Sequence, residues 1–318
     1  MEIGTDTSKA SELLQSGAVV AIPTETVYGL AANALEAQQV AQIFDLKQRP
    51  AFDPLIIHLA SADDLDLYVK DRGPYFDALY KAFSPGPISY VLPKKAIIPD
   101  LVTAGHPTVA VRFPSHPLCQ ELLQKLDFPL AAPSANLFGR VSPTEAGHVA
   151  EQFPEEIPYI LNGGPAAIGL ESTIIDLSSE QPIVLRLGGL GLEEIEVVLG
   201  RPVQFTKSSS SNPKAPGMLS AHYSPGIPLV HGKIDQQIQN ANRKRSGTIS
   251  FCKKIAAIPE EQQRVLSPKG DLKEAASKLF SALRSFKAAD VDVIFAEEFP
   301  DEGLGRAIND RLRRASVA

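Results

Sequence analysis

The sequence predicts an α/β fold with a mixed sheet, followed by a second and smaller α/β unit. Short apolar runs typical of buried strands alternate with segments whose apolar residues recur at helical spacing. Several successive strand-like runs have no helix between them, which favours a sheet with both parallel and antiparallel pairs. A stretch rich in Ser and Pro, residues 207–225, then separates these runs from a further strand–helix alternation and is typical of a linker.

The first unit begins with a short amphipathic helix at residues 8–16, for which Ser8 or Thr7 is the expected N-cap. An apolar run at residues 18–23 predicts a buried strand that ends in a polar segment, Thr24 to Gly29. Further strands are expected at residues 55–59, 88–92, 109–113, 129–133, 159–161, 173–177 and 183–187. Helices are expected at residues 36–46, 61–69, 75–83, 116–126, 143–153 and 192–199.

The second unit is predicted to be a small, Rossmann-like βαβ domain with three strands, arranged in parallel. Its strands are expected at residues 227–230, 248–252 and 291–296, and its helices at 233–243, 272–286 and 305–315. The chain of 318 residues therefore divides into a catalytic domain at 1–204, a linker at 205–226 and a C-terminal domain at 227–318.

Composition excludes several classes of protein. A net charge of -6 and a pI of about 5.6 argue against a protein that holds nucleic acid through phosphate contacts. Cys119 and Cys252 are far apart and no CxxC occurs, so we expect two reduced thiols and no zinc site. The N-terminus lacks the features of a signal peptide, and no apolar run reaches membrane-spanning length. A cytoplasmic protein without a membrane or DNA partner is expected.

Two cations follow the helix expected at residues 36–46. Lys47 and Arg49 are placed on a Pro-bounded loop, near the hydroxyls that end the strand at 18–23, and this arrangement suits a polyanion such as a triphosphate. The alternative is a solvated pair at the helix C-terminus, where cations complement the helix dipole.

Other polar residues stand at strand ends or inside strands. Ser134 and Ser142 have hydroxyls suited to phosphate oxygens, although Ser142 also reads as a helix N-cap. Arg112 and Arg186 are cations within apolar strands; each either faces solvent or pairs with a carboxylate in a pocket. His58 is either a core imidazole or a ligand. Neither GxxxxGK[ST] nor GxGxxG occurs, so the residues alone favour an α/β enzyme that handles a nucleotide or phosphate by another route.

Taken together, these segments resemble the YrdC/Sua5 family. The resemblance rests on PTETVYGLAANA, KQRP before PLIIHLAS, SPGPISYVLP, TVAVRFPSHP, APSAN, SPT, IGLESTIIDLS and VLRLGG, and continues through APGMLSAHYSP into the C-terminal domain. It implies a twisted α/β sheet with a large concave cavity. It also implies a nucleotidyltransferase that converts L-threonine, bicarbonate and ATP into L-threonylcarbamoyladenylate and diphosphate. That product supplies the t6A modification of adenosine 37 in ANN-decoding tRNAs.

The resemblance also implies roles for single residues. Lys47 and Arg49 are the family's KxR pair and the expected catalytic residues. The residues that match the L-threonine site are Thr26, His58, Arg112, Ser172 and the backbone of Ala132. The residues that match the ATP site are Arg49, Thr108, Ser134, Asn136, Ser142, Arg186 and Tyr223. Asp53 stands where many members have Asn, and we hold it as a further candidate beside the nucleotide. Mg²⁺ is expected to arrive with ATP, without direct protein ligands.

The linker is expected to fold over the cavity as a lid, because Tyr223 lies within it. We expect a monomer. The resemblance implies that its product passes to a tRNA threonylcarbamoyl transferase, with at most weak contact to tRNA. One alternative is a nucleotide- or RNA-binding regulatory module that uses the same cavity without turnover. Another is a carbamoyl-adenylate enzyme acting on a different amine, like the related hydrogenase-maturation proteins, whose acylphosphatase and zinc-finger parts are absent here.

Overall fold

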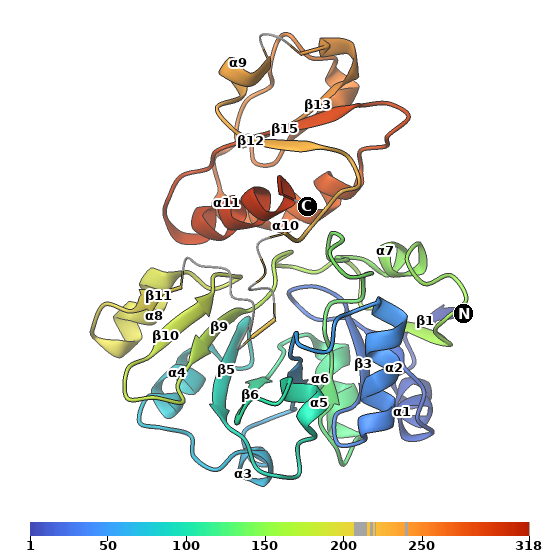
Figure 1. Ribbon diagram of the computed structural model, residues 1–318, viewed down its shortest axis with the longest axis vertical. Helices are drawn as coiled ribbons and strands as arrows, with labels where there is room; N and C mark the ends of the chain where they lie inside the picture. Colours follow the sequence, from blue (N-terminus) through green and yellow to red (C-terminus); the bar gives the residue numbers. More distant parts are fainter. Residues whose placement is uncertain (207–214, 217–218, 220, 239–240, 318) are drawn as a thin grey trace.

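The computed structural model describes residues 1–206, 215–216, 219, 221–238 and 241–317. Most of the predicted linker, residues 207–214, 217–218 and 220, therefore lies outside the described residues. Figure 1 shows two units one above the other, with the described ends of the linker between them. Within the described residues, no helix is both long and apolar enough to cross a bilayer.

The larger unit is built on a mixed sheet, as predicted. Its 11 strands lie in the order β1-β8-β2-β3-β7-β4-β6-β5-β9-β10-β11. The pairs β4–β6 and β5–β9 are parallel, whereas β5–β6 and β9–β10 are antiparallel. The strands are β1 (Glu2–Gly4), β2 (Val20–Ile22), β3 (Gly29–Asn33), β4 (Ile56–His58), β5 (Ile88–Pro93), β6 (Thr108–Arg112), β7 (Leu130–Ala131), β8 (Tyr159–Leu161), β9 (Thr173–Asp176), β10 (Ile183–Arg186) and β11 (Gln204–Phe205).

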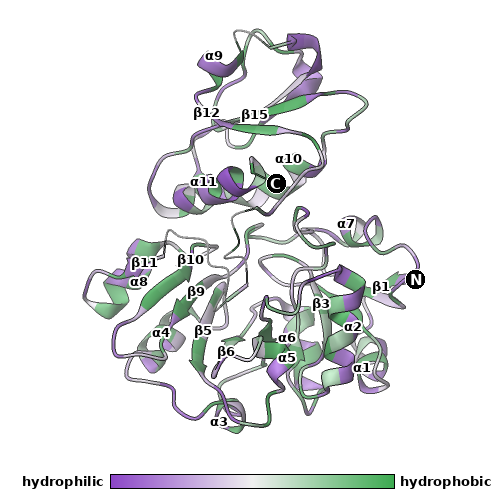
Figure 2. Ribbon diagram, viewed as in Figure 1, coloured by the Kyte–Doolittle hydropathy of each residue, from purple (hydrophilic) through white to green (hydrophobic). Residues whose placement is uncertain are grey.

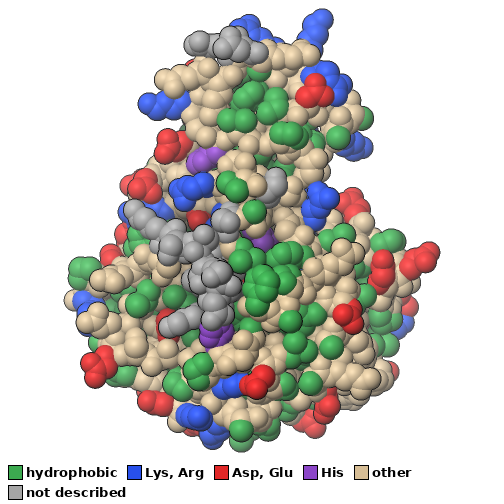
Figure 3. All heavy atoms as spheres, viewed as in Figure 1, with side chains coloured by type: hydrophobic (Ala, Val, Ile, Leu, Met, Phe, Trp, Pro, Cys, Tyr) green, Lys and Arg blue, Asp and Glu red, His purple; other side chains and the backbone are tan. Residues whose placement is uncertain are grey.

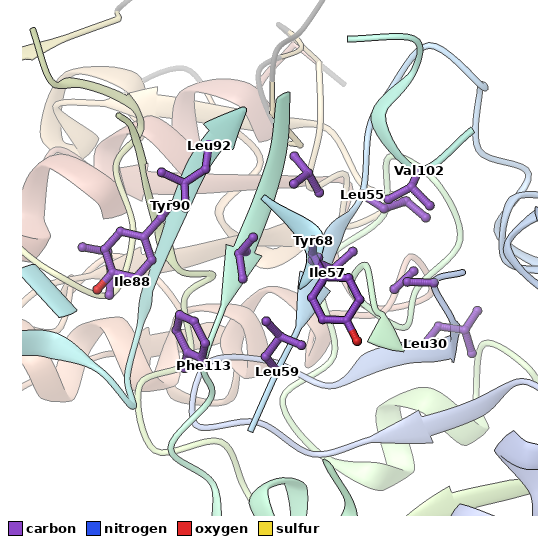
Figure 4. Packing of buried hydrophobic residues seen from close by; sticks show 14 of the residues in the cluster. Leu30, Leu55, Ile57, Leu59, Tyr68, Ile88, Tyr90, Leu92, Val102 and Phe113 are labelled. Carbon is purple, nitrogen blue, oxygen red and sulfur yellow. The ribbon is translucent and has the colours of Figure 1, made fainter. Parts of the chain in front are cut away.

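Side-chain alternation along the central strands separates a packed face from the face that carries the polar residues. Ile57, Val111 and Tyr90 point into the main hydrophobic core, part of which Figure 4 shows from close by. Their strand neighbours Ile56 and Ala110 point to the opposite face, into a smaller cluster that is closed by Ala215 of the linker. Ala215, one of the described linker residues, thus packs on this face of the sheet.

Helices cover the rest of the larger unit. Helices α1 and α6 contact each other, and their apolar residues share a core cluster with β2 and β8. Helix α2 packs on β3, and α4 packs on α8. The helices of this unit are α1 (Thr7–Gln15), α2 (Ala37–Lys47), α3 (Leu65–Tyr68), α4 (Phe76–Phe83), α5 (Asp100–Thr103), α6 (Pro117–Gln124), α7 (Ala146–Ala150) and α8 (Leu192–Leu199).

The C-terminal unit contains an all-parallel sheet in the order β12-β15-β13-β14. These strands are β12 (Leu229–Gly232), β13 (Ser246–Ser250), β14 (Gln263–Val265) and β15 (Val293–Glu297). Helices α10 (Leu272–Arg284) and α11 (Gly303–Ala315) lie between this sheet and the larger unit, while α9 (Ile234–Gln237) lies beyond the sheet (Figure 1). Strands β12 and β15 are mostly apolar in Figure 2, whereas the visible part of α11 is largely polar.

The structure differs from the predictions in several elements. The N-cap of α1 is Asp6, whose carboxylate accepts from Ser8 N and Lys9 N, and not Ser8 or Thr7. The segment after Gly29 forms strand β3, antiparallel to β2. The parallel sheet has a fourth strand, β14, which is too short and polar to show period-two alternation. The predicted helix at 233–243 contains α9 and a separate 3₁₀ turn at Arg243–Arg245, and its residues 239–240 lie outside the described residues.

Candidate active site

Strand pairing alone places three polar residues in one row. Parallel pairing of β4 with β6 sets His58 opposite Arg112, and antiparallel pairing of β5 with β6 sets Ser89 opposite the same arginine. Ser89 Oγ lies 2.8 Å from the Oγ of Ser172, which directly precedes β9. His58 and Arg112 follow Ile56 and Ala110 by two residues, so they point to the face on which Ala215 packs.

A cavity of about 490 Å³, counting space open to solvent, lies over this row. Eight residues proposed from the sequence line it: Arg49, His58, Arg112, Ala132, Ser134, Ser172, Arg186 and Tyr223. Six lining residues were not singled out: Val27, Ile56, Pro133, Glu171, Pro216 and His222.

Arg112 is held in place by a carboxylate from the segment after β2. Its Nη2 donates to Glu25 Oε1 at 2.8 Å and lies 3.5 Å from Thr24 Oγ1. The other carboxylate oxygen of Glu25 accepts from Ser115 N at 3.1 Å. The buried Arg112 Nε has no acceptor within the described residues. Arg112 is therefore buried in the site and does not face solvent, and it retains one N–H donor for an anionic ligand.

His58 is a neutral imidazole at physiological pH. Burial, with a further contribution from the Arg112 guanidinium, lowers the pKa of His58 to about 3. Its Nδ1 has no hydrogen-bond partner among the described residues. A neutral ring beside a cation is able to accept or donate one hydrogen bond without adding charge to the cavity.

Arg49 forms a buried pair with Asp53. Arg49 Nη2 lies 2.9 Å from Asp53 Oδ2, yet the contact lacks hydrogen-bond geometry, and the guanidinium instead donates to the carbonyls of Asp53 and Pro54. Burial raises the pKa of the Asp53 carboxyl, and the Arg49 charge opposes this shift. Burial also lowers the pKa of Arg49. The Arg49 charge thus partly offsets the repulsion that an unpaired Asp53 carboxylate would exert on bound phosphates.

Lys47 is the last residue of α2 and not part of the loop after it. Its ammonium donates to the carbonyls of Ser134 and Asn136, and burial lowers the pKa of Lys47 well below its ordinary value. The Asn136 amide in turn donates to the carbonyls of Leu137 and Arg140. The KxR lysine and the SxN asparagine thereby fix the loop that presents Ser134. A direct phosphate contact by Lys47 stays a prediction, since it does not line the cavity in the described part of the chain.

Ser142 lies behind the lining residue Glu171 and donates to its Oε1 at 2.6 Å. Burial acts to raise the pKa of Glu171, but the guanidinium groups of Arg311 and Arg186 outweigh it, and the pKa falls to about 2. Ser142 is therefore bonded to an ionised carboxylate, and not an N-cap of the described helices. The sequence offered one signal for Glu171, its place in IGLESTIID between a Gly-Leu turn and a strand.

Arg186 reaches the cavity because β10 is irregular. The register of the β9–β10 pair shifts between Val184 and Arg186, which lets Leu185 and Arg186 both approach the linker side. Arg186 donates to Ser172 O at 2.9 Å and, through Nη1, to Pro216 O at 3.1 Å. Arg186 thus joins the sheet to the linker.

The described end of the linker closes one side of the cavity. Tyr223 adopts a left-handed backbone (φ 67°), which is uncommon for a non-glycine residue, and burial raises its pKa to about 12. Its neighbour His222 lies 4.2 Å away, ring to ring, and burial lowers the pKa of His222 to about 3. Ser224 N donates to Gly139 O at 2.8 Å, which ties this segment to the loop after the SxN motif.

Six of the proposed site residues do not line the cavity in the described chain: Lys47, Asp53, Asn136 and Ser142, whose contacts are given above, and Thr26 and Thr108. Thr26 is buried beside the cavity, with its hydroxyl 2.8 Å from that of Thr24. Thr108 begins β6, at the opposite end of the strand from Arg112. Ligand contacts by Thr26 and Thr108 stay predictions.

On the face shown in Figure 3, Lys and Arg side chains are interspersed with Asp and Glu side chains over both units. The described side chains on this face form no continuous basic surface of the kind that proteins use to hold nucleic acid through its phosphates. Within the described residues, no group of three His, Cys, Asp or Glu side chains is placed to hold a metal ion.

Comparison with family models gives two matches that cover nearly the whole chain. Residues 12–188 match the Sua5/YciO/YrdC model, which carries the description "Telomere recombination". Residues 190–317 match a model described as "Threonylcarbamoyl-AMP synthase, C-terminal domain". The second match begins before α8 and β11, although both of these elements pack in the larger unit.

Relatives that match nearly the whole chain are named threonylcarbamoyl-AMP synthase, as in the description of the second family model. A threonylcarbamoyl-AMP synthase of Pyrococcus abyssi is 43% identical, over 96% of this chain and 93% of the relative. One of Bacillus subtilis is 39% identical, over 97% and 92%. The crystal structure of P. abyssi Sua5 complexed with L-threonine has a TM-score of 0.92 at 39% identity, and the match covers 100% of this chain and 98% of the other. Escherichia coli YciO, at a TM-score of 0.53 and 23% identity over 58% of this chain and 93% of its own, shares the fold of the larger unit.

Proposed function

Because this chain belongs to the Sua5/YciO/YrdC family, we propose that it is a threonylcarbamoyl-AMP synthase, a nucleotidyltransferase that condenses L-threonine, bicarbonate and ATP into L-threonylcarbamoyladenylate and diphosphate. Its product would serve the t6A modification of adenosine 37 in ANN-decoding tRNAs. The observation that carries the proposal is that His58, Arg112 and Ser172 together line the cavity. The chain that carries them has the same fold as a relative complexed with L-threonine.

The L-threonine site is proposed at these three residues. The unpartnered Nε of Arg112 suits the carboxylate of the amino acid, since a guanidinium binds carboxylates through paired donors. The neutral His58 and the Ser172 hydroxyl suit the hydroxyl and amino groups, and the Ala132 backbone borders the same space.

The ATP site is proposed on the opposite side, between Arg49, Ser134, Arg186 and the linker residue Tyr223. In the reaction, bicarbonate takes up a proton and releases water to give CO₂. The nitrogen of threonine then bonds to the carbon of CO₂ and loses a proton, which gives a carbamate. A carbamate oxygen then attacks the α-phosphorus of ATP, the bond to the bridging oxygen breaks, and diphosphate leaves. The two guanidinium groups neutralise charge that develops on the phosphates, and the cavity excludes water from the labile product.

Magnesium is proposed to enter with ATP, held by its phosphates, and to neutralise part of their charge when bound. The residue that fits this arrangement is Asp53, because both of its buried carboxylate oxygens lack a hydrogen-bond donor within the described residues. An oxygen ligand of this type suits a water molecule on Mg²⁺ better than it suits a bare phosphate.

We propose the domain organisation that was predicted from the sequence: a catalytic domain at 1–204, a lid-like linker at 205–226 and a C-terminal domain at 227–318. The enzyme is proposed to act in the cytoplasm as a monomer and to pass its product to a tRNA threonylcarbamoyl transferase. The contacts of Pro216, His222 and Tyr223 with the cavity support the lid.

The test is a mass-spectrometric assay with purified protein, ATP, Mg²⁺, L-threonine and bicarbonate, in which each component is omitted in turn. We expect threonylcarbamoyladenylate and diphosphate only when all components are present. ATP binding without this product would favour a regulatory nucleotide- or RNA-binding module, and product formed only with another amine would favour a different carbamoyl-adenylate enzyme.

A further inference from the structure

One arginine of the C-terminal unit reaches the border of the cavity. Arg311, in the middle of α11, is the largest fully buried side chain among the described residues. Its Nε donates to Glu171 Oε2 at 2.9 Å, and its Nη2 donates to Leu187 O at 2.8 Å. Its guanidinium carbon lies 5.2 Å from the centre of the Tyr223 ring. Arg311 therefore contacts two cavity-lining residues without lining the cavity itself.

Glu171 would oppose nucleotide binding if it stood alone. It is a buried carboxylate on the side of the cavity that holds Arg186, where we place the phosphates. An uncompensated charge in a buried site is strongly unfavourable, and it would also repel a polyanion. Arg311 supplies the compensating charge, while Ser142 occupies the second carboxylate oxygen. With both oxygens bonded, the carboxylate is fixed.

Tyr223 is fixed between the two C-terminal helices. Its ring stacks on Phe280 of α10, with centroids 5.5 Å apart, and Arg311 of α11 lies against it. A guanidinium over a tyrosine ring is attractive and adds to the packing. The backbone of Tyr223 is held in a left-handed conformation that the surrounding contacts must stabilise.

The C-terminal unit is closely fitted to the loops that carry these residues. Gly169 has a left-handed backbone (φ 74°), and a side-chain carbon there would lie 2.6 Å from the backbone of Ser277 in α10. Thr144 Oγ1 lies 3.1 Å from Ser281 Oγ, and Arg284 donates to the carbonyl of Val141. Such contacts are those of a rigid interface and not of a loosely tethered domain.

We propose that Arg311 is a positioning residue for the nucleotide side of the active site, and that it acts through Glu171 and Tyr223. The C-terminal domain thereby completes the site that the larger unit begins. This inference rests on the proposed function only in taking the ligand beside Arg186 to be ATP.

The experiment compares Arg311→Met with the double variant Glu171→Gln/Arg311→Met. Equilibrium dissociation constants are measured by calorimetry for the magnesium complex of α,β-methylene ATP and separately for L-threonine, and KM and kcat are then measured by diphosphate release. Arg311→Met is expected to weaken nucleotide binding about tenfold or more, since it removes the cation bonded to Glu171 and leaves Arg186 to offset only part of that charge, and to change threonine binding less than about threefold. The double variant removes the carboxylate charge and is expected to recover much of the loss.

Arg313→Gln is the matched control, because Arg313 is an exposed arginine of the same helix, 3.9 Å from Asp310. It should leave both dissociation constants unchanged. If Arg311→Met does not fold, Arg311→Lys tests the same point: it keeps one charge but cannot serve Glu171 and Leu187 O together, so nucleotide binding should weaken at unchanged threonine binding.

A lower melting temperature with both dissociation constants unchanged would overturn the proposal, and so would a double variant that binds nucleotide no better than Arg311→Met. A wild-type protein that binds the ATP analogue but forms no adenylate would refute the proposed function alone, and the binding comparison would still decide the role of Arg311. Failure of the wild-type protein to bind the analogue would overturn both.

Discussion

Replacement of Arg112 by lysine tests the threonine side of the cavity most directly. The side chain is 5% exposed, and its Nη2 is already occupied by Glu25. Lysine preserves the positive charge, so the buried carboxylate of Glu25 keeps a partner and the fold should be retained. The single ammonium cannot also supply the donor that Nε offers, because the ammonium is drawn to Glu25.

The expected loss follows from one hydrogen bond to a charged ligand. Such a bond contributes about 1.5–3 kcal/mol. This corresponds to a rise of about 10- to 150-fold in KM for L-threonine, with KM for ATP nearly unchanged. The assay is initial-rate release of diphosphate as a function of L-threonine at saturating ATP and bicarbonate, supported by calorimetric titration with L-threonine alone.

Arg72→Lys is the control, since Arg72 pairs with the exposed Asp66 on the surface of the same unit. It should behave as the wild type. If Arg112→Lys raises KM for ATP but leaves KM for L-threonine within about twofold, Arg112 does not bind the amino acid, and the proposed assignment of the two sides is wrong.

Three further predictions concern buried charge. Arg49→Ala should lower turnover at least about 100-fold, because it removes a contact to the transition-state charge. It should also lower the free energy of unfolding by about 3 kcal/mol, because it leaves Asp53 unpaired. Adding Asp53→Asn to this variant should restore part of the stability in urea titrations but not the turnover. Lys47→Met should cost about 2 kcal/mol of stability, since two buried carbonyls lose their donor while the desolvation of the ammonium is relieved, and an unchanged urea midpoint would contradict this. The folded pKa values of His58 and His222 are about 3, so below about pH 6.5 the unfolded chain binds protons that the folded chain does not. The free energy of unfolding should therefore decrease by up to about 1.4 kcal/mol per pH unit for each histidine between about pH 6 and 4. ¹H–¹⁵N spectra should show both rings neutral at pH 6.

Local pattern was sufficient for most of the elements. The helix at residues 192–199 and the strand at 159–161 lie where the apolar spacing predicted them. Strands β1 (Glu2–Gly4) and β11 (Gln204–Phe205) were not predicted, because neither contains an apolar run, and they form only through pairing at the edges of the sheet. Predicted helix ends differ from the observed ones by a few residues, as for Asp6, whose capping role depends on the backbone turn before α1.

Among the site residues, the cations and hydroxyls were identifiable from their positions, whereas their partners were not. Glu25 follows a predicted strand and Glu171 precedes one in IGLESTIID, but neither position, nor that of His222, indicates which partner the side chain meets. Arg112 meets Glu25 from a strand 87 residues away in the chain, and Arg311 meets Glu171 from a helix 140 residues away. His222 gains its role from the burial of the linker segment that it shares with Tyr223. A buried carboxylate becomes significant only when its surroundings remove water and supply a cation.

By itself, the sequence determined the mixed α/β class, the place of the linker and the set of residues from which a cavity for an anionic ligand is made, because these depend on periodicity, composition and motifs that short segments carry. The tertiary structure decided which of these residues meet. Strand register brought His58 to Arg112, an irregular β10 turned Arg186 toward the linker, and α11 placed Arg311 against Glu171. Such contacts are set by pairing and packing between distant segments, and burial then fixes the charge of each group; neither is encoded in any one stretch of the chain.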